Sequence, residues 1–461
     1  MNSIRDTLLP FFTVLLLLQG CQADPYREAV NDLAKPYLEQ EYLVGVSIGI
    51  LTPEGQYTYH FGQTQSGGPI PTDETLYEIG SITKTMTGLM LADGVTRGRY
   101  DVDEPVASLL GDGIEVDERI TLRRLSTHTS GLTRLPSNMF PSDPRNPYAA
   151  YSEQHLLAFL KKPSMQSEPG TEASYSNIGV GLLGYALAKH EQTSYEDLLK
   201  RRVLKPLGMD DTTITLDHVH ENHMAQPHTT DGALAHLWDM PTLAGAGGVR
   251  ANVVDMLAYS TAQIDPDSTP LADAIRLSHT NQSRPGDVAF DAPMGLGWFI
   301  GEHATEVSHR GGTGGFLSML KISLKDRTAV VVLSNSASKH AGTLAKQVTQ
   351  LVNGKAIDPV NLPKAVVLEQ AVLEQYVGHY KLLDLGFIEI ELDGDKLYTR
   401  QNSQKRNRLF PESKTSFRNR ATESTVRFDR DKTGEVTGLT LIQYGHELTC
   451  PRVVKDQNDQ D

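Results

Sequence analysis

The sequence predicts an α+β protein, in which an antiparallel sheet flanked by helices is followed by a small antiparallel β-barrel domain. Two alternating apolar runs, residues 44–51 and 57–62, are separated by the turn Pro53-Glu54-Gly55, which is typical of a hairpin in an antiparallel sheet. Apolar residues recur at helical spacing between residues 26 and 41, which indicates a flanking helix. From residue 376 onward, short alternating segments separated by Gly and Asp turns favour a second, all-β domain.

The composition is that of a globular protein with a large core. The chain has 461 residues, of which 39% are hydrophobic and 22% charged, so it is longer than one ordinary domain requires. Lys and Arg total 43 against 57 Asp and Glu, which gives a formal net charge of −14. This acidity argues against nucleic acid or anionic lipid as a partner of the main body.

The N-terminus has the pattern of an export signal. Arg5 precedes an apolar run at residues 8–18, which is too short to span a bilayer and suits a secretory signal peptide over residues 1–20. The run ends in Leu18-Gln19-Gly20-Cys21, which resembles the cleavage site of bacterial lipoproteins. We therefore expect an exported lipoprotein, anchored through Cys21 on the periplasmic side of a membrane. The alternative is ordinary signal cleavage with Cys21 incidental. Because Cys450 is the only other cysteine, a lipidated Cys21 excludes an intrachain disulfide.

A serine and a lysine suited to nucleophilic catalysis stand at Ser81 and Lys84, just before an apolar-studded run that predicts a helix. Residues three apart on a helix project from the same side, so Lys84 can take the proton of Ser81. A helix that begins near Ser81 also favours an oxyanion there. The same spacing recurs at Ser318–Lys321 and Ser336–Lys339, in or beside runs that predict strands, where such positions face opposite sides. The alternative for Ser81 is a helix N-cap.

Two further motifs carry candidate site residues. In Tyr175-Ser176-Asn177, a tyrosine near an ammonium can have a lowered pKa and act as acid or base, and the amide can hold both the lysine and a substrate carbonyl. The alternative is a loop tyrosine that caps the next helix. In the Gly-rich run 308–316, His309 is followed by Gly311 and Gly312, which allow the close backbone approach that a substrate lying along an edge strand requires. The alternative is a simple Gly-rich hairpin.

Two other patterns are weaker. Gly45-Val46-Ser47-Ile48-Gly49 matches the nucleophile elbow of α/β-hydrolases, but the alternation runs straight through Ser47 where an elbow needs a sharp turn before a helix. His218, His220, His223 and His228 lie close together in sequence, so a metal site is conceivable. We favour a solvated loop over a metal site.

The three motifs in this order resemble those of the class C β-lactamase and penicillin-recognising serine hydrolase superfamily, over residues 25–352. The resemblance implies a β-lactamase/transpeptidase-like domain with an all-helical region beside the sheet. Five shorter stretches support it: His128-Thr129-Ser130-Gly131-Leu132, Pro206-Leu207-Gly208-Met209 with Thr212, Gly247-Gly248-Val249, Gly295-Leu296-Gly297-Trp298, and Val330 to Asn335.

The resemblance also implies roles for the site residues. Ser81 would form the acyl-enzyme, Lys84 would assist its deprotonation and Tyr175 would pass the proton to the leaving group. Asn177 would bind the acyl side of the substrate, and the backbone N–H groups of Ser81 and Gly312 would form the oxyanion hole. No metal or cofactor is implied.

One position departs from the β-lactamases. His309 stands where they carry a lysine, and a histidine is largely neutral at pH 7, so it is a weaker anchor for a β-lactam carboxylate. This His-x-Gly form is similar to D-aminopeptidases, family VIII-type esterases and some penicillin-binding proteins. We therefore expect hydrolysis of an amide or ester bond in a D-amino-acid peptide, a β-lactam or a small ester. A β-lactamase proper and a penicillin-binding or sensor protein without turnover are the alternatives.

The C-terminal part is expected to be a separate domain. Residues 353–365 contain Pro359 and Pro363 and are predicted to form a linker. Residues 366–456 look like the lipocalin-like domain often appended to these hydrolases, and they contain no catalytic constellation. The sequence leaves this domain's role and the oligomeric state open.

Overall fold

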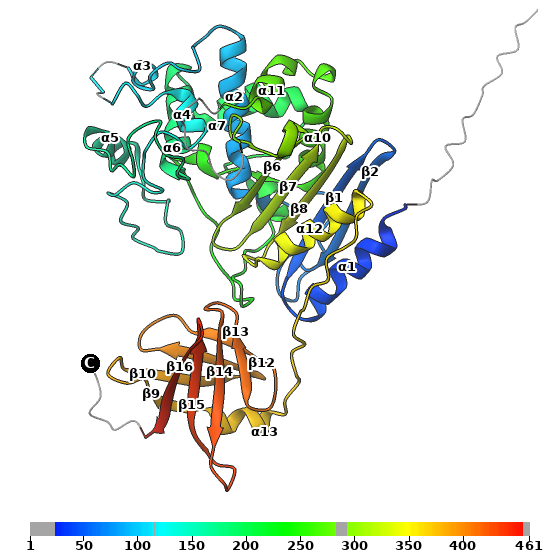
Figure 1. The fold of residues 1–461 in the computed structure, drawn as a ribbon, viewed down its shortest axis with the longest axis vertical. Helices are drawn as coiled ribbons and strands as arrows, with labels where there is room; N and C mark the ends of the chain where they lie inside the picture. The colour runs from blue at the N-terminus through cyan, green and yellow to red at the C-terminus, as the bar shows by residue number, and fades with distance from the viewer. Residues whose placement is uncertain (1–23, 112, 115, 283–292, 455–461) are drawn as a thin grey trace, which may run out of the picture.

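The structure is a computed structural model that describes residues 24–454, except 112, 115 and 283–292. A body of sheet and helices stands above a smaller barrel (Figure 1). This is the α+β arrangement that the sequence predicts. The expected signal peptide and Cys21 lie outside the described residues. Among the described helices, none is long and apolar enough to cross a membrane.

The body is built on a six-stranded antiparallel sheet with the strand order β2-β1-β8-β7-β6-β5. Its strands are β1 (Gly45–Thr52), β2 (Gly55–Gly62), β5 (Phe299–Ile300), β6 (Glu306–Gly312), β7 (Leu317–Ser323) and β8 (Thr328–Ser334). The β-branched run of β8 lies at the centre, where side chains on both faces are buried. β5 pairs only with Ser308 and Val307 of β6, so the His309 end of β6 lies beyond β5.

Helices cover both faces of this sheet (Figure 1). α1 (Arg27–Glu39) and α12 (His340–Val352) pack on one face, where Val46, Ile48 and Val332 form a core with them. α10 (Val253–Ile264) packs against β1 and β8 on the other face. That second face continues into the larger core of the helical region, so the sheet separates two apolar layers.

The helical region surrounds α2 (Thr83–Thr96), whose residues from Thr83 to Gly94 are all buried. Its other elements are β3 (Tyr77–Glu78), η1 (Gly80–Ile82), α3 (Ala107–Leu110), α4 (Leu122–Ser126), α5 (Glu153–Lys161), α6 (Asn177–His190), α7 (Tyr195–Leu199), η2 (Lys200–Leu204), α8 (Lys205–Leu207), α9 (His218–His223), η3 (Ala244–Ala246), β4 (Arg250–Ala251), η4 (Pro266–Ser268), α11 (Ala272–His279) and η5 (Glu302–Ala304). A helix buried all round must be held by its neighbours, so α2 fixes the arrangement of this region.

The C-terminal domain is a closed antiparallel barrel of eight strands, as the alternating pattern predicts. It contains α13 (Gln370–Leu373), η6 (Glu374–Tyr376), β9 (Gly378–Lys381), β10 (Phe387–Asp393), β11 (Lys396–Gln401), β12 (Asn407–Pro411), β13 (Ser416–Asn419), β14 (Ser424–Arg430), β15 (Val436–Gln443) and β16 (His446–Val453). Tyr376 stacks on Phe428 with ring centroids 4.1 Å apart, and Phe417 meets Phe428 edge-on at 5.5 Å. Cys450 is buried in the same core. The interior is therefore filled by side chains rather than left open.

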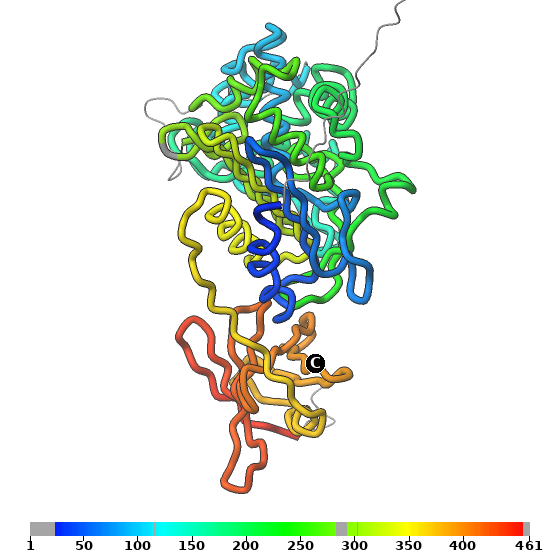
Figure 2. The backbone as a smooth tube through the Cα atoms, turned by 90° about the vertical axis from the view of Figure 1, so that its right-hand side faces the viewer, coloured from blue at the N-terminus to red at the C-terminus, as the bar shows by residue number. Residues whose placement is uncertain are grey.

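Two arginines dock the barrel against the body. Arg420 donates to the carbonyl oxygens of Gln40 and Glu41 at 2.9 and 2.7 Å, just after α1 ends. Its guanidinium lies 3.7 Å from the ring centroid of Tyr42 and 3.6 Å from that of Phe410, one ring from each domain. The chain between α12 and α13 descends along the side of the molecule to reach the barrel (Figure 2).

A second contact involves a loop of the body. The backbone N–H of Arg408 on β12 donates to Asp231 Oδ2 at 3.0 Å, and the Arg408 guanidinium pairs with Glu41. The barrel is thus held to the body through the end of α1 and through the loop around Asp231, and Lys339 just before α12 pairs with Glu423 of the barrel.

A matched pair of glycine substitutions tests the packing of α2. A Cβ on Gly88 would lie 2.0 Å from the carbonyl oxygen of Leu296, whereas a Cβ on Gly342 in α12 meets nothing within 4 Å. Gly88→Ala should lower the free energy of unfolding by about 1–3 kcal/mol, because the backbone at residue 296 must move. Gly342→Ala should raise it by about 0.5–1 kcal/mol, because alanine loses less entropy in a helix. Denaturant unfolding followed by near-UV circular dichroism measures both, and equal effects of the two changes would contradict the packing.

Candidate active site

Ser81 and Lys84 lie where the chain passes from β3 into α2. Ser81 belongs to the 3₁₀ turn η1, and Lys84 follows in the first turn of α2, so the helix begins just after the serine rather than before it. Lys84 Nζ lies 3.0 Å from Ser81 Oγ. The lysine side chain is fully buried, while Ser81 is partly exposed. The spacing in the sequence therefore predicts the pair, and the structure brings the two groups into contact.

The Lys84 amine is held by two further acceptors. It donates to Asn177 Oδ1 at 2.9 Å and to the carbonyl oxygen of Ala246 at 2.5 Å. Burial lowers the pKa of Lys84 well below its usual value, and the positive charge of Arg134 adds to the effect. A neutral amine has two N–H groups and one lone pair. In the neutral form, the two N–H groups can serve the two carbonyl acceptors, and the lone pair can then accept the proton of Ser81.

Tyr175 lies beside this pair. Its ring centroid is 4.9 Å from Lys84 Nζ, and its hydroxyl hydrogen-bonds with Ser81. Burial raises the pKa of Tyr175 to about 12, although the contact with Ser81 and the charge of Arg134 act in the opposite direction. The lowered pKa suggested by a neighbouring ammonium is wrong, because the cost of burying a phenolate dominates. The phenol is therefore protonated at neutral pH.

His128 holds Tyr175 in place, a function that the sequence analysis did not assign. Its ring packs against the ring of Tyr175 with centroids 4.3 Å apart, and its Nδ1 accepts the backbone N–H of Ser176 at 3.2 Å. His128 has a φ of 61°, which is uncommon for a residue other than glycine. Burial keeps the pKa of His128 well below its usual value, so the ring is neutral. In the sequence, the stretch His128 to Leu132 supports the family resemblance, but it does not indicate that His128 contacts Tyr175.

His309 faces the site from β6. Its ring centroid lies 6.4 Å from that of Tyr175 and 5.3 Å from that of Phe299. Burial lowers the pKa of His309 to about 3, so it carries no charge at neutral pH. Arg310 is exposed and pairs in register with Met319, whose side chain packs in the core beneath α12. As the strand alternation predicts, Arg310 points to the opposite face from His309.

Gly311 and Gly312 bring the end of β6 against the segment that carries Ser81. A Cβ on Gly311 would lie 1.9 Å from the carbonyl oxygen of Ile79, so at this position the close neighbour is the protein's own backbone rather than a substrate. A Cβ on Gly80 would lie 2.6 Å from the amide nitrogen of Gly312. The Gly312 amide therefore lies against Gly80, the residue before Ser81, whereas a Cβ on Gly312 would meet only the carbonyl oxygen of Phe316, at 3.8 Å.

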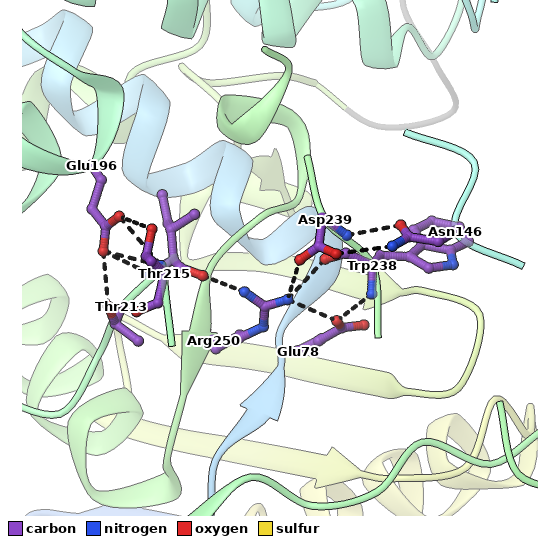
Figure 3. A network of polar contacts seen from close by, with 9 residues as sticks. Glu78, Asn146, Glu196, Thr213, Thr215, Trp238, Asp239 and Arg250 are labelled. Carbon is purple, nitrogen blue, oxygen red and sulfur yellow. Dashed lines mark hydrogen bonds and ion pairs between the residues drawn. The ribbon is translucent and has the colours of Figure 1, made fainter. Parts of the chain in front are cut away.

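A buried ion pair ties the segment before Ser81 to the rim of the site (Figure 3). Glu78 on β3 and Arg250 on β4 pair in register, and their side chains approach to 3.5 Å with almost no exposure. Arg250 also contacts Asp239 at 3.3 Å, and Glu78 accepts the backbone N–H of Trp238 at 2.7 Å. Asp239 is in turn held by Asn146, through two hydrogen bonds of 2.9 Å. These contacts fix the loop that precedes Tyr148.

Tyr148 connects this rim to the catalytic groups. Asn177 Nδ2 donates to the Tyr148 hydroxyl at 2.9 Å, and the Tyr148 ring lies 5.4 Å from that of Trp238. No sequence motif singles out Tyr148. The carbonyl of Ala246 was missed for a different reason, because a main-chain atom has no residue-type signature.

The remaining sequence candidates lie apart from this site. Ser47 is buried in the middle of the straight strand β1, where its Oγ lies 2.9 Å from both His60 Nδ1 and the Tyr77 hydroxyl. No turn into a helix follows, so the elbow geometry is absent at this serine. Ser318 donates to the carbonyl of Ile79 at 2.7 Å, and Lys321 pairs with Glu306.

The histidine cluster is helical in part, which corrects the expected loop. Asp217 accepts backbone N–H groups at the start of α9, and this cap allows the helix His218–His223 to form. His220 contacts Asp217 at 2.6 Å, whereas His228 is buried beside the carbonyl of Asn335. In the part of the chain that the structure describes, no three His, Cys, Asp or Glu residues are grouped to hold a metal ion.

Comparisons with known proteins agree with the fold. The Beta-lactamase family matches residues 30–353, and a domain of unknown function, DUF3471, matches residues 362–452. A beta-lactamase of Providencia stuartii is 31% identical over 262 residues, which are 55% of this chain and 65% of that protein, so the match spans slightly less than two thirds of the relative. Penicillin-binding protein 4* of Bacillus subtilis (strain 168) is 24% identical over 425 residues, which cover 86% of this chain and 92% of that protein.

Solved structures show the same fold. A class C beta-lactamase superposes with a TM-score of 0.61 at 21% identity, over 72% of this chain and 97% of that structure. A serine just before a buried helix that carries a lysine, set against the end of an antiparallel sheet, defines the class of protein as a serine hydrolase. Because the family match covers well over half of the chain, the protein belongs to the Beta-lactamase family.

Proposed function

We propose that this protein hydrolyses an amide or ester bond through an acyl-enzyme formed on Ser81. The observation that carries the proposal is the buried Lys84 amine, 3.0 Å from Ser81 Oγ and held by Asn177 and Ala246. A serine hydroxyl is a weak nucleophile until a base takes its proton. A lysine whose pKa is lowered by burial supplies that base at neutral pH.

In the acylation step, Ser81 Oγ attacks the substrate carbonyl while Lys84 Nζ accepts the hydroxyl proton. The oxygen of the tetrahedral intermediate is stabilised by the N–H groups of Ser81 and Gly312, because Gly80, the residue before Ser81, lies against the Gly312 backbone. Lys84 returns the proton through the phenol of Tyr175 to the leaving nitrogen or oxygen. The bond from the acyl carbon to the leaving group then breaks, and Lys84 and Tyr175 are neutral again.

Deacylation reverses these roles. Water enters from the exposed side of Ser81, and Tyr175 with Lys84 takes its proton as the new bond to the acyl carbon forms. The ester bond to Ser81 Oγ breaks, and the serine oxygen recovers a proton. His128 contributes by keeping Tyr175 oriented through ring contact and through the N–H of Ser176.

The substrate class that we propose is a D-amino-acid peptide or a small ester, with a β-lactam as the second candidate. His309 is neutral, and Arg310 projects from the opposite face of the sheet, so neither supplies the fixed positive charge that a β-lactam carboxylate meets in the lactamases. The names of the Providencia stuartii and Escherichia coli (strain K12) relatives, both beta-lactamases, are what favours the second candidate.

Acyl adducts distinguish these possibilities. Intact mass should show one adduct on the wild-type protein with at least one of a penicillin, a D-Ala-D-Ala peptide and a short-chain ester. Ser81→Ala should form none, and its turnover should fall by at least about 10³-fold. Rapid turnover of a chromogenic cephalosporin would favour the β-lactamase, and a stable penicillin adduct without turnover would favour a binding protein. Equal adduct formation by Ser81→Ala would contradict the proposal.

The pH dependence of turnover tests the lysine's role. The lowered pKa of Lys84 leaves the active, neutral amine available above that pKa, so kcat/KM should fall as the pH drops through it. Tyr175, with a pKa of about 12, should cause no loss on the alkaline side between about pH 8 and pH 10. Hydrolysis of a neutral ester between about pH 5 and pH 10 measures the profile. A rate that instead declines above about pH 8 would indicate that the protonated lysine is required.

We also propose that the protein is an exported lipoprotein of the cell envelope, on the strength of the signal-like run 8–18 and the lipobox-like sequence ending at Cys21. Expressed in a bacterium with a labelled fatty acid, the full-length chain should take up label and fractionate with membranes. Cys21→Ser should do neither, whereas Cys450→Ser should behave like the wild type. Label that persists in Cys21→Ser would contradict the anchor.

A further inference from the structure

Arg134 lies at the mouth of the site and is held there by the catalytic segment itself. Its carbonyl oxygen accepts the backbone N–H of Asn177 at 2.9 Å and that of Ile178 at 3.3 Å, at the start of α6. Its side chain is exposed, and its guanidinium carbon is 5.2 Å from the ring centroid of Tyr175. The backbone of Arg134 is therefore fixed relative to Asn177, while its charged group stands over the phenol that we propose transfers the proton.

This guanidinium has no acidic partner among the described residues. The groups on which its charge acts are Lys84, His128, Tyr148 and Tyr175, all of them in the site. Several other exposed arginines of this acidic chain are paired, as Arg119 is with Asp117 and Arg145 with Asp143. An unpaired surface arginine is ordinary in itself, but one that faces neutral and basic groups around a nucleophile leaves the site electropositive.

Other cations near Tyr175 are unsuited to bind an anionic group of the substrate. Lys84 is fully buried and occupied by Asn177 and Ala246. His309 is neutral, and Arg310 belongs to the opposite face of the sheet. Arg134 is thus the one cation at this mouth, within the described chain, that combines an exposed guanidinium with a position over the reacting groups.

We propose that Arg134 binds a carboxylate carried by the substrate, so that the enzyme prefers acyl compounds with one negative charge. This inference rests on the proposed Ser81 hydrolase. A guanidinium offers a fork of N–H donors that matches a carboxylate. One guanidinium balances one unit of negative charge, whereas a phosphate carries nearly two at neutral pH, so a carboxylate is the better match. Arg134 would thus bind the substrate carboxylate, which the neutral His309 cannot attract by charge.

Matched esters test the proposal without knowledge of the natural substrate. The first pair is p-nitrophenyl hemiglutarate and its methyl ester, which differ only in a carboxylate on the acyl chain. The second pair is p-nitrophenyl acetate and its ring-carboxylated analogue, which places the carboxylate on the leaving group. The readout is the ratio of kcat/KM for the charged ester to that for the neutral ester, corrected for the intrinsic hydrolysis rates.

Three variants separate Arg134 from its surroundings. In the wild type, the ratio should exceed one in at least one pair and should fall as salt is added. Arg134→Gln should lower the ratio by at least about tenfold, and Arg134→Lys should retain part of it because the charge remains. Arg310→Gln, which removes an exposed cation on the opposite face, should leave the ratio within about twofold.

The outcomes distinguish this inference from the proposed function. Ser81-dependent cleavage with equal rates for charged and neutral esters would overturn the role of Arg134 and leave the hydrolase intact. A preference that survives Arg134→Gln, or that is lost in Arg310→Gln, would likewise overturn the assignment. If no ester is cleaved in a Ser81-dependent manner, the proposed function fails, and this inference fails with it.

Discussion

The burial of one amine organises the site. Lys84 is removed from water in the first turn of α2, and a charged ammonium there would lose hydration that two carbonyl acceptors replace only in part. The neutral form avoids this cost, and its lone pair can accept the proton of Ser81. The burial of Lys84 therefore favours the neutral amine beside Ser81. It also requires hydrogen-bond acceptors for the amine, which α6 and η3 supply. The helical region has to be packed around α2 for these acceptors to meet at one nitrogen.

The other contacts of the site hold Ser81, Lys84 and their neighbours in fixed relative positions. Gly80 and Gly311 let the segment before Ser81 and the end of β6 approach more closely than side chains would permit. His128, with its positive φ, supports Tyr175, and the buried Glu78–Arg250 pair connects β3 to the rim. Breaking a buried ion pair of this kind costs about 3–5 kcal/mol, which explains why a polar pair can serve as a fixed joint. The barrel is docked away from these contacts, through Arg420 and Arg408, by hydrogen bonds and ring stacking.

Much of this architecture could be predicted from the sequence. Alternation along β1 and β2 predicts the hairpin, the turn-punctuated C-terminal pattern predicts the barrel, and a spacing of three on a helix brings Ser81 and Lys84 together. The parts that could not be predicted depend on tertiary context. The carbonyl of Ala246 is a main-chain atom, and the pKa of Tyr175 rises because burial outweighs its neighbours.

Other features could not be predicted from the sequence for related reasons. The importance of Gly311 lies in its contact with Ile79, a residue distant in sequence, and not in a space for substrate. The helix α9 depends on the N-cap residue Asp217, and the histidines that follow Asp217 gave no indication of a helix in the sequence. Arg134 belongs to no recognised motif, and only its position over Tyr175 sets it apart from other arginines.

The ionisation state of Lys84 is the measurement that tests this account most directly. Nuclear magnetic resonance of the protein with isotope-labelled lysine side chains, titrated with acid and base and assigned through Lys84→Met, reports the charge on this one amine. A buried, neutral Lys84 should give a signal with the shift of a neutral amine at neutral pH, which moves to the ammonium position only on acidification. A signal that stays at the ammonium position until the pH at which exposed lysines titrate would contradict a neutral Lys84.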